Sequence, residues 1–386
     1  MSTALFLCLA WGILTLWVRD RWAVSSFQVG ALVLAAISLV RSWKDGKPPR
    51  WHPLLWPLAA IPAWGLVQLA LGISVDPWNT SEAILIWAGH FAVAFVAVQV
   101  AGEARRLRIL LAGFGVTLAV ESMMQCWTAG GRVFWLFDSG YTERVFGPFV
   151  YHNKFAQFVE LIMPIVLFQS MVDRKRALLW FTGAALLFGG ILASASRSGL
   201  LLALLALGLF LAAGFVSGAV RGRAVLWLAL GLALLCAGGA VLAGWTGTLE
   251  RLTGLDPRFD LRVPIWKSTL AMIRERPGVG FGLGSFPIVY PAYAELDVGL
   301  TVNTAHQDWL QWVAEGGLPM LLAMLGFTGM AAPRLFRSIW GTGVLAVLLH
   351  GLLDYPMHQT PAFASLVIAV ATLSATSEHE VSPRSL

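Results

Sequence analysis

Charged residues are scarce in this sequence. Asp, Glu, Lys and Arg together make up 12% of its 386 residues, about half of the ~25% that is usual in soluble globular domains. Hydrophobic residues make up 58% of the chain, and 18 residues are Trp. This composition excludes an ordinary soluble domain and predicts an integral membrane protein.

Cysteine is also rare. The sequence has Cys8, Cys126 and Cys236, and each lies inside an apolar run. Thiols placed in this way offer neither a disulfide framework nor a cysteine-based metal site. We expect them to fill the apolar core.

Acidic residues are fewer than basic ones, 21 against 27, which gives a formal net charge of +6. The basic residues fall in short clusters between apolar runs, a pattern typical of topology signals and not of a nucleic-acid-binding surface. If the spans alternate in direction, all the clusters lie on one side of the membrane, and both termini lie on that side too. The positive-inside rule predicts that this side is cytoplasmic. Arg19 and Arg21 fall on the other side. The clusters lie at 41–50, 105–108, 174–176, 221–223 and 334–337.

Apolar runs close to the ~20 residues that a bilayer requires recur about twelve times along the chain. The sequence therefore predicts an all-α integral membrane protein, with residues 1–386 forming a single polytopic membrane domain. The expected spans are at about 3–18, 22–40, 53–73, 82–100, 108–128, 154–172, 177–194, 198–218, 224–245, 306–330, 339–353 and 361–375.

The external side carries the polar sequence in this arrangement. Three external segments are too polar or too unusual to be simple turns, namely 129–153, 194–198 and 246–305. The last of these is a large loop between the ninth and tenth spans. Its apolar residues recur at near-helical spacing from Leu261 to Ile273, which predicts an amphipathic helix at the membrane surface. Function is therefore expected on the external face.

His306 lies at the start of an apolar span, in the stretch "NTAHQDWLQWVAEGG". The pattern Thr304-x-x-Gln307 fits a capping box, which would place His306 in the first turn of a helix. The partial positive charge of a helix N-terminus disfavours imidazolium, so a neutral ring with an available lone pair is expected. This suits a general base. The alternative is a histidine that only forms hydrogen bonds at the membrane interface.

Two external arginines suit phosphate oxygens. Arg197 lies in the tight turn "SASRSG", where Ser198 is positioned to cap the next helix, and a guanidinium beside a helix N-terminus favours anions. Arg262 lies on the expected amphipathic helix, from which its long side chain can reach a lipid headgroup. For each arginine alone, an interfacial anchor is the favoured interpretation. Together with a neutral histidine, the two arginines form a candidate site.

Several of these stretches resemble, in order and spacing, the bacterial O-antigen ligase and polysaccharide polymerase superfamily. The resemblance covers about residues 140–365. The stretches that carry it are "RVFGPFVYHNKFAQF", "SASRSG", "LRVPIWKSTLAMIRERPGVGFGLGSF", "TAHQDWLQWVAEGGLP" and "HGLLDYPMHQTP".

The resemblance implies a GT-C-type glycosyltransferase of surface polysaccharide synthesis in the bacterial inner membrane. It would take a glycan from an undecaprenyl pyrophosphate carrier on the periplasmic face. The ligase branch transfers the glycan to a lipid A core sugar, and the polymerase branch transfers it to another carrier-linked repeat unit. The segment 246–305 would then be a periplasmic loop.

The resemblance also assigns roles to residues. It implies that Arg197 and Arg262 hold the donor pyrophosphate and that His306 is the base. No metal or other cofactor is expected, because two arginines can stabilise the leaving-group charge that a divalent ion stabilises elsewhere. Direct displacement at the sugar carbon C1 would invert the anomeric centre.

Other polar residues are candidates with weaker support. Arg144 and Asn153 are placed to contact donor phosphate or sugar, although capping or loop anchoring explains them equally well. Asp354 lies at the outer end of a span, where a carboxylate requires water or a partner, so it is expected to orient the acceptor or the histidine. Glu315 is expected to be structural. His350 is expected to pack between helices. His152 and His358 are expected to lie at the membrane interface.

Other functions stay open on the sequence alone. A multispan transporter is the main alternative from another class, although the internal repeats and broken helices typical of transporters are not evident here. Protein O-glycosylation from the same type of donor is a further variant of the transferase. A scaffolding membrane protein would leave the arginines and the histidine without a role.

Overall fold

The computed structural model describes residues 1–386 except 142–144, 217–230, 232–256, 296–300, 359 and 376–386. The described chain is helical apart from one antiparallel hairpin, in which β1 (Arg132–Val133) pairs with β2 (Phe137–Asp138). The helices are α1 (Ser2–Leu14), α2 (Arg21–Lys44), α3 (Leu55–Ala70), α4 (Pro77–Gln99), α5 (Ala104–Thr128), α6 (His152–Val172), α7 (Ala177–Ser194), α8 (Arg197–Val216), α11 (Pro257–Glu275), α12 (Phe286–Val289), α13 (Asp308–Arg337), α14 (Thr342–His350) and α15 (Thr360–Ala375).

Seven helical segments in the described part of the chain are long and apolar enough to cross a membrane. They correspond to α2, α4, α5, α6, α7, α8 and α13, and α1 and α3 are shorter apolar helices. The protein is therefore an all-helical, multi-pass membrane protein, as the sequence predicts. The count of about twelve spans stays a prediction, and the expected span 224–245 lies outside the described residues except for Gly231.

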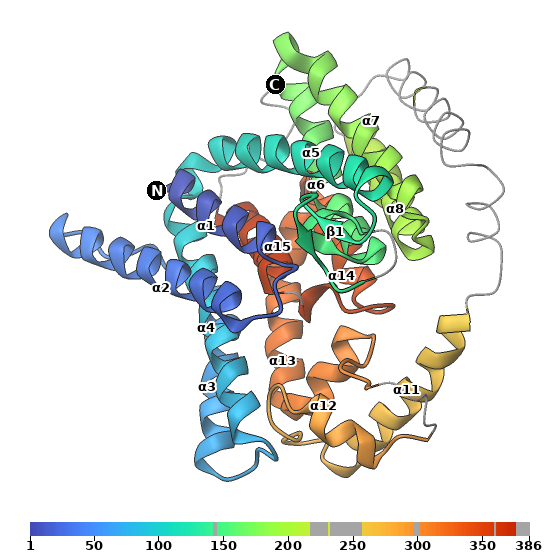
Figure 1. Ribbon diagram of the computed structural model, residues 1–386. Helices are drawn as coiled ribbons and strands as arrows, with labels where there is room; N and C mark the ends of the chain where they lie inside the picture. The colour runs from blue at the N-terminus through green and yellow to red at the C-terminus, as the bar shows by residue number, and fades with distance from the viewer. Residues whose placement is uncertain (142–144, 217–230, 232–256, 296–300, 359, 376–386) are drawn as a thin grey trace.

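Helix α6 is the central helix of the bundle. Of its most apolar stretch, 83% is buried, whereas the corresponding figure for α8 is 39%. Helices α5, α7, α8 and α14 pack around α6, and α3, α4 and α15 pack with α13 in the other half of the molecule (Figure 1). A helix that is buried on nearly all sides has no lipid to face. Any polar group on α6 must therefore find its partner inside the protein.

Helix α11 is the helix expected between the ninth and tenth spans, and it buries Ile265 and Met272 from the predicted apolar face. A glycine-rich segment, residues 277–284, follows it and runs along a kink in α13. Phe281 N donates to Ala314 O at 3.0 Å, and Gly282 N donates to Glu315 O at 2.9 Å. These bonds fix the α11–α12 region to the N-terminal part of α13 (Figure 1).

The kink in α13 is at Gly317, whose backbone has φ 62° and ψ −156°. Side-chain-bearing residues essentially never adopt this conformation. A Cβ atom at Gly317 would also lie 2.6 Å from Gly278 O. Glycine is therefore required here both by the backbone conformation and by the close approach of the 277–284 segment.

Glu315 lies just before the kink and is 5% exposed. Its carboxylate accepts hydrogen bonds from Gly284 N at 2.8 Å and from Gln311 Nε2 at 3.0 Å. These contacts agree with the structural role expected from the sequence: Glu315 holds the glycine-rich segment against α13.

We predict that Gly317→Ala destabilises the protein by about 1–3 kcal/mol or more, because alanine adds backbone strain and a steric clash. Gly329→Ala is the matched control, since Gly329 lies in the same helix with helical φ and no atom within 4 Å of a new Cβ. That variant should stay within about 1 kcal/mol of the wild type. Thermal unfolding in detergent measures both. Equal stability of the two variants would contradict the role assigned to the kink.

Candidate functional site

Asp354 lies in the segment after α14, and its carboxylate connects residues from distant parts of the chain. Oδ2 accepts a hydrogen bond from Asn153 Nδ2 at 3.3 Å and lies 3.5 Å from Arg262 Nη2. Oδ1 accepts a hydrogen bond from the backbone N–H of Tyr355 at 3.1 Å and lies 3.6 Å from His306 Nδ1. Four of the predicted site residues therefore meet at one carboxylate that is 3% exposed.

The charge of Asp354 is set by these neighbours. Burial alone disfavours a carboxylate, but the facing His306 and the guanidinium of Arg262 outweigh it and hold the pKa of Asp354 below its ordinary value. His350 adds to this effect. The site therefore contains a negative charge that is enclosed by positive or hydrogen-bonding groups.

Arg262 lies in the second turn of α11, with a side chain that is 15% exposed. Its Nη1 donates a hydrogen bond to the carbonyl of Leu353 at 2.9 Å, and its Nη2 faces Asp354. Because a guanidinium has several N–H donors in one plane, these two contacts fix its orientation and leave other donors for a ligand.

His306 lies just before α13, not inside its first turn. The helix begins at Asp308, and Gln307 is its N-cap residue, whose side chain accepts a hydrogen bond from Leu310 N at 3.2 Å. The capping box predicted from Thr304 is therefore wrong. His306 has φ 50°, in the left-handed region, and this backbone conformation ends any helix that would include it.

The imidazole of His306 packs edge-on against Tyr355, with ring centres 5.0 Å apart, and is 34% exposed. Its Nδ1 faces Asp354 at 3.6 Å, which is beyond hydrogen-bond distance but close enough for an electrostatic contact. A carboxylate on the Nδ1 side favours the proton there. Nε2 is then the nitrogen available for proton transfer.

Arg197 is the first residue of α8 and follows a turn in which Ala195 is left-handed, with φ 51°. The hydroxyl that caps the start of α8 belongs to Ser196, which accepts a hydrogen bond from Gly199 N at 3.2 Å. The expectation that Ser198 caps this helix is therefore wrong. Ser198 Oγ lies instead 3.1 Å from His350 Nε2. This contact links the start of α8 to α14, four residues before Asp354.

His350 and Glu160 form a fully buried pair that the sequence did not suggest. His350 Nδ1 lies 3.0 Å from both carboxylate oxygens of Glu160, and both side chains are 0% exposed. His350 was expected only to pack between helices. The signal that could have found the pair is the acidic residue inside the apolar span 154–172, because an ionisable residue in a span requires a partner.

A second pair joins His358 to Asp308, the first residue of α13, by a hydrogen bond between Nδ1 and Oδ1. Asp308 Oδ2 also accepts a hydrogen bond from Met357 N at 3.0 Å. Burial opposes protonation of His358, but the hydrogen bond and charge of Asp308, with Glu315 behind it, outweigh burial and raise the pKa of His358. The segment that carries Asp354 is therefore tied to the start of α13.

The remaining predicted residues contribute less. Arg144 lies outside the described residues. His152 lies at the start of α6, as expected near the end of a span. No group of three or more His, Cys, Asp or Glu side chains that could hold a metal ion occurs within the described ranges. Independence of metal stays a prediction.

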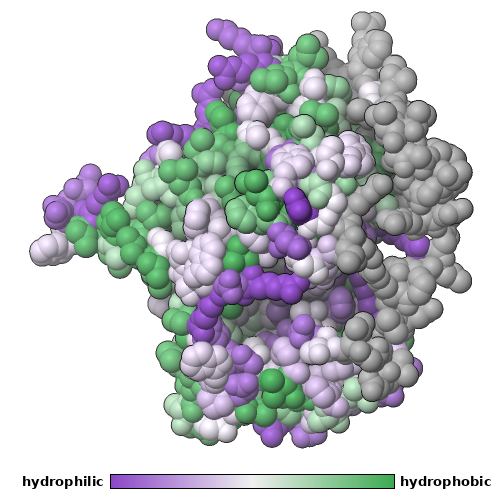
Figure 2. All heavy atoms as spheres, viewed as in Figure 1, coloured by the Kyte–Doolittle hydropathy of each residue, from purple (hydrophilic) through white to green (hydrophobic). Residues whose placement is uncertain are grey.

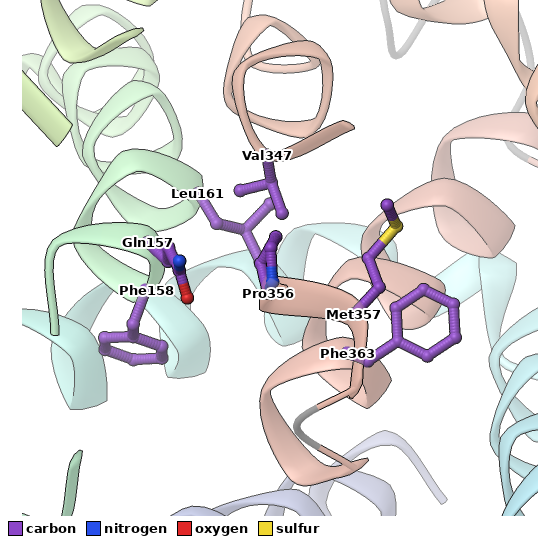
Figure 3. A pocket seen from close by; sticks show the side chains of 7 residues that line it. All are labelled: Gln157, Phe158, Leu161, Val347, Pro356, Met357 and Phe363. Atoms are coloured by element: carbon purple, nitrogen blue, oxygen red, sulfur yellow. The ribbon is translucent and has the colours of Figure 1, made fainter. Parts of the chain in front are cut away.

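One face of the molecule is hollowed. Figure 2 shows hydrophilic residues gathered around a hollow in the middle of this face, between the part that contains α14 and the part that contains α11 and α12. A separate small cavity lies between α6, α14, the turn η5 (Pro356–His358) and α15, and its lining is mainly apolar (Figure 3). The predicted site residues are not among those that line this cavity. The polar hollow is therefore the better place for a charged or sugar ligand.

A comparison with protein-family models adds an independent finding. Residues 182–325 match the model described as O-Antigen ligase. This part of the chain is similar to the O-antigen ligase family. The match covers a little over a third of the chain and contains Arg197, Arg262 and His306, and it supports the resemblance to the O-antigen ligase and polysaccharide polymerase superfamily. A comparison with curated proteins gave no match.

We predict that the pair of His358 with Asp308 makes stability depend on pH. Because folding raises the pKa of His358, its contribution is complete below the ordinary value of ~6.5 and decreases as the pH rises through the folded-state pKa. The stability difference between the wild type and His358→Gln should therefore shrink with rising pH. Thermal unfolding in detergent between about pH 5 and pH 9 measures it.

His52→Gln is the matched control for this experiment. Burial, together with the charge of Arg334, lowers the pKa of His52, so protonation opposes folding at that position. The wild type should then lose stability relative to His52→Gln as the pH falls, which is the opposite trend. If the stability difference from the wild type changes with pH in the same direction for both variants, the His358 pair is not the cause of the pH dependence.

Proposed function

We propose that this protein is a membrane glycosyltransferase of the O-antigen ligase or polysaccharide polymerase type. It transfers a glycan from an undecaprenyl pyrophosphate carrier to a hydroxyl of a lipid A core sugar or of another carrier-linked repeat unit. The observation that carries the proposal is the shared carboxylate of Asp354, which faces a guanidinium on Oδ2 and an imidazole on Oδ1. The family match over 182–325 supports the same class.

The reaction needs a base and a cation close together, and His306 and Arg262 meet this requirement. The acceptor oxygen attacks C1 of the first donor sugar, its proton passes to His306 Nε2, and the bond between C1 and the pyrophosphate oxygen breaks. Arg262 and Arg197 stabilise the negative charge that develops on the departing pyrophosphate. Attack from the side opposite the leaving group inverts the anomeric centre.

Asp354 has a positioning role in this proposal. Its charge favours the Nδ1–H form of His306, which leaves the Nε2 lone pair free, as the aspartate does in a catalytic triad. It also orients Arg262, while Asn153 donates a hydrogen bond to the same carboxylate and holds it in place. Arg144 is a further candidate for donor contact on sequence grounds alone.

The proposed site lies on the periplasmic face of a bacterial inner membrane, with both termini in the cytoplasm. This orientation rests on the basic clusters and the positive-inside rule. The two arginines provide positive charge at the leaving group, so we expect no metal or other cofactor in the reaction.

The function is tested with purified protein in detergent. The protein is incubated with an undecaprenyl pyrophosphate-linked repeat unit, with and without lipid A core. A ladder of products without core identifies a polymerase, and one new product that requires core identifies a ligase. If the wild-type protein forms neither product, the proposal is contradicted.

We predict that His306→Ala lowers turnover by roughly 10²–10⁴, the usual contribution of a positioned base. Donor binding should change little, because the arginines carry it. Gln307→Ala is the adjacent control: it removes the N-cap of α13 and should cost about 0.5–2 kcal/mol of stability without a comparable loss of turnover. Near wild-type transfer by His306→Ala would exclude His306 as the base.

We predict that neither Arg262→Lys nor Arg197→Lys restores full activity, although lysine keeps the charge. A lysine ammonium cannot donate two parallel hydrogen bonds to a pyrophosphate, and at position 262 it cannot contact Leu353 O and Asp354 in the same way. The affinity for undecaprenyl pyrophosphate should fall with the activity. Wild-type affinity and turnover in both lysine variants would reduce the arginines to interfacial anchors.

A further inference from the structure

Tyrosine is the rarest aromatic residue of this chain, with 5 residues against 22 Phe and 18 Trp. Three of the five tyrosines lie together beside the site: Tyr141 follows the β1–β2 hairpin, Tyr151 is the N-cap residue of α6, and Tyr355 follows Asp354. We call these three residues the tyrosine row. A local concentration of a rare residue suggests a chemical requirement that Phe or Trp would not meet.

The row is continuous from His306 outward. Tyr355 packs edge-on against His306, with ring centres 5.0 Å apart. Lys154 Nζ lies over the rings of both Tyr355 and Tyr151, at 5.9 and 5.4 Å from their centres. Tyr151 and Tyr141 are edge-on at 4.9 Å, and the Tyr151 hydroxyl donates a hydrogen bond to the Tyr141 hydroxyl at 2.7 Å.

The middle member of the row is the most exposed one. Tyr151 is 40% exposed, and Tyr141 and Tyr355 are partly buried. At its far end, the guanidinium of Arg19 lies 5.2 Å from the centre of the Tyr141 ring. The basic residue that counted against the topology in the sequence therefore has a local partner. An interfacial aromatic belt would direct isolated rings toward lipid. Here Tyr141 contacts Tyr151, Lys154 connects Tyr151 to Tyr355, and Tyr355 contacts His306.

We infer that the tyrosine row is a glycan-binding subsite, in which sugar rings next to the reacting sugar stack on Tyr151 and Tyr141. A sugar ring has a face of C–H groups that packs on an aromatic face, and it has hydroxyls that require hydrogen-bond partners. Tyrosine has both a flat apolar ring and a hydroxyl, and Lys154 between the rings is a further donor. This inference rests on the proposed function and names the part of the glycan that the protein holds.

The bound sugars could belong to the donor glycan or to the acceptor. The chemistry that the row recognises is the same in both cases, because each substrate presents sugar rings close to His306 during transfer. The two sources differ in which substrate loses affinity when the row is changed. The experiment therefore titrates each substrate separately.

The variants are Tyr151→Ala and Tyr141→Ala, with Tyr151→Phe to remove only the hydroxyl. Trp78→Ala is the matched control, since Trp78 is 69% exposed at the outer end of α4 and has Arg21 over its ring at 5.5 Å, outside the row. Affinity is measured for undecaprenyl pyrophosphate with and without the repeat unit, and for lipid A core. KM is measured for each substrate with the other saturating.

Each alanine variant should weaken binding of one sugar-bearing substrate by about two- to tenfold, the range of a single aromatic contact. Binding of undecaprenyl pyrophosphate without sugar should not change, and Trp78→Ala should behave as the wild type. Tyr151→Phe should lie between Tyr151→Ala and the wild type. A rise in KM for the donor alone assigns the row to the donor glycan, and a rise for the acceptor alone assigns it to the acceptor.

Two results would overturn the inference. One is unchanged affinity for every sugar-bearing substrate in both alanine variants. The other is an equal loss for the carrier with and without sugar, together with a lower unfolding temperature, which would mean that the tyrosines only hold the hairpin to α6. Failure of the proposed function is distinct, because then the wild-type protein itself would form no transfer product.

Discussion

A buried carboxylate on an irregular segment is the constraint on which the rest of this site depends. An ionised carboxylate that is removed from water is unstable unless positive or hydrogen-bonding groups surround it. Asp354 obtains such groups from α6, from α11, from His306 in front of α13 and from its own backbone neighbour. Satisfying one charge thus brings together segments that are up to about two hundred residues apart in the sequence.

The surrounding structure keeps those segments in register. The hydrogen bonds of the glycine-rich segment hold α11 against α13, and the contacts of Asp308 hold the start of α13 against residues 351–357. The pair of Glu160 with His350, extended by Ser198, connects α6, α14 and the first turn of α8. Each connection uses a polar group that the bilayer would not tolerate alone, so the polar contacts also determine how the apolar helices are arranged.

The sequence predicts the helices well and their polar contacts poorly. The span expected at 177–194 coincides with α7, and that at 154–172 begins within two residues of α6, because a bilayer requires long apolar helices whose ends coincide with polar residues. Asn153, Arg262 and His306 were candidates individually, as was Asp354, but it was not evident that the first three share the carboxylate of the fourth. Contacts such as those of Asn153 or Glu160 join residues about 190 to 200 positions apart, and no local periodicity encodes them.

The capping box predicted from Thr304 is wrong because of the backbone conformation of His306. His306 lies in a left-handed conformation outside the helix. Such a conformation costs a non-glycine residue about 1–3 kcal/mol and persists only where the surrounding structure enforces it. A side chain within a helix points along the helix toward its N-terminus and moves whenever the terminal turn frays. The imidazole of His306 lies outside the terminal turn, and its contacts with Tyr355 and Asp354 are to the segment after α14 and not to α13 itself.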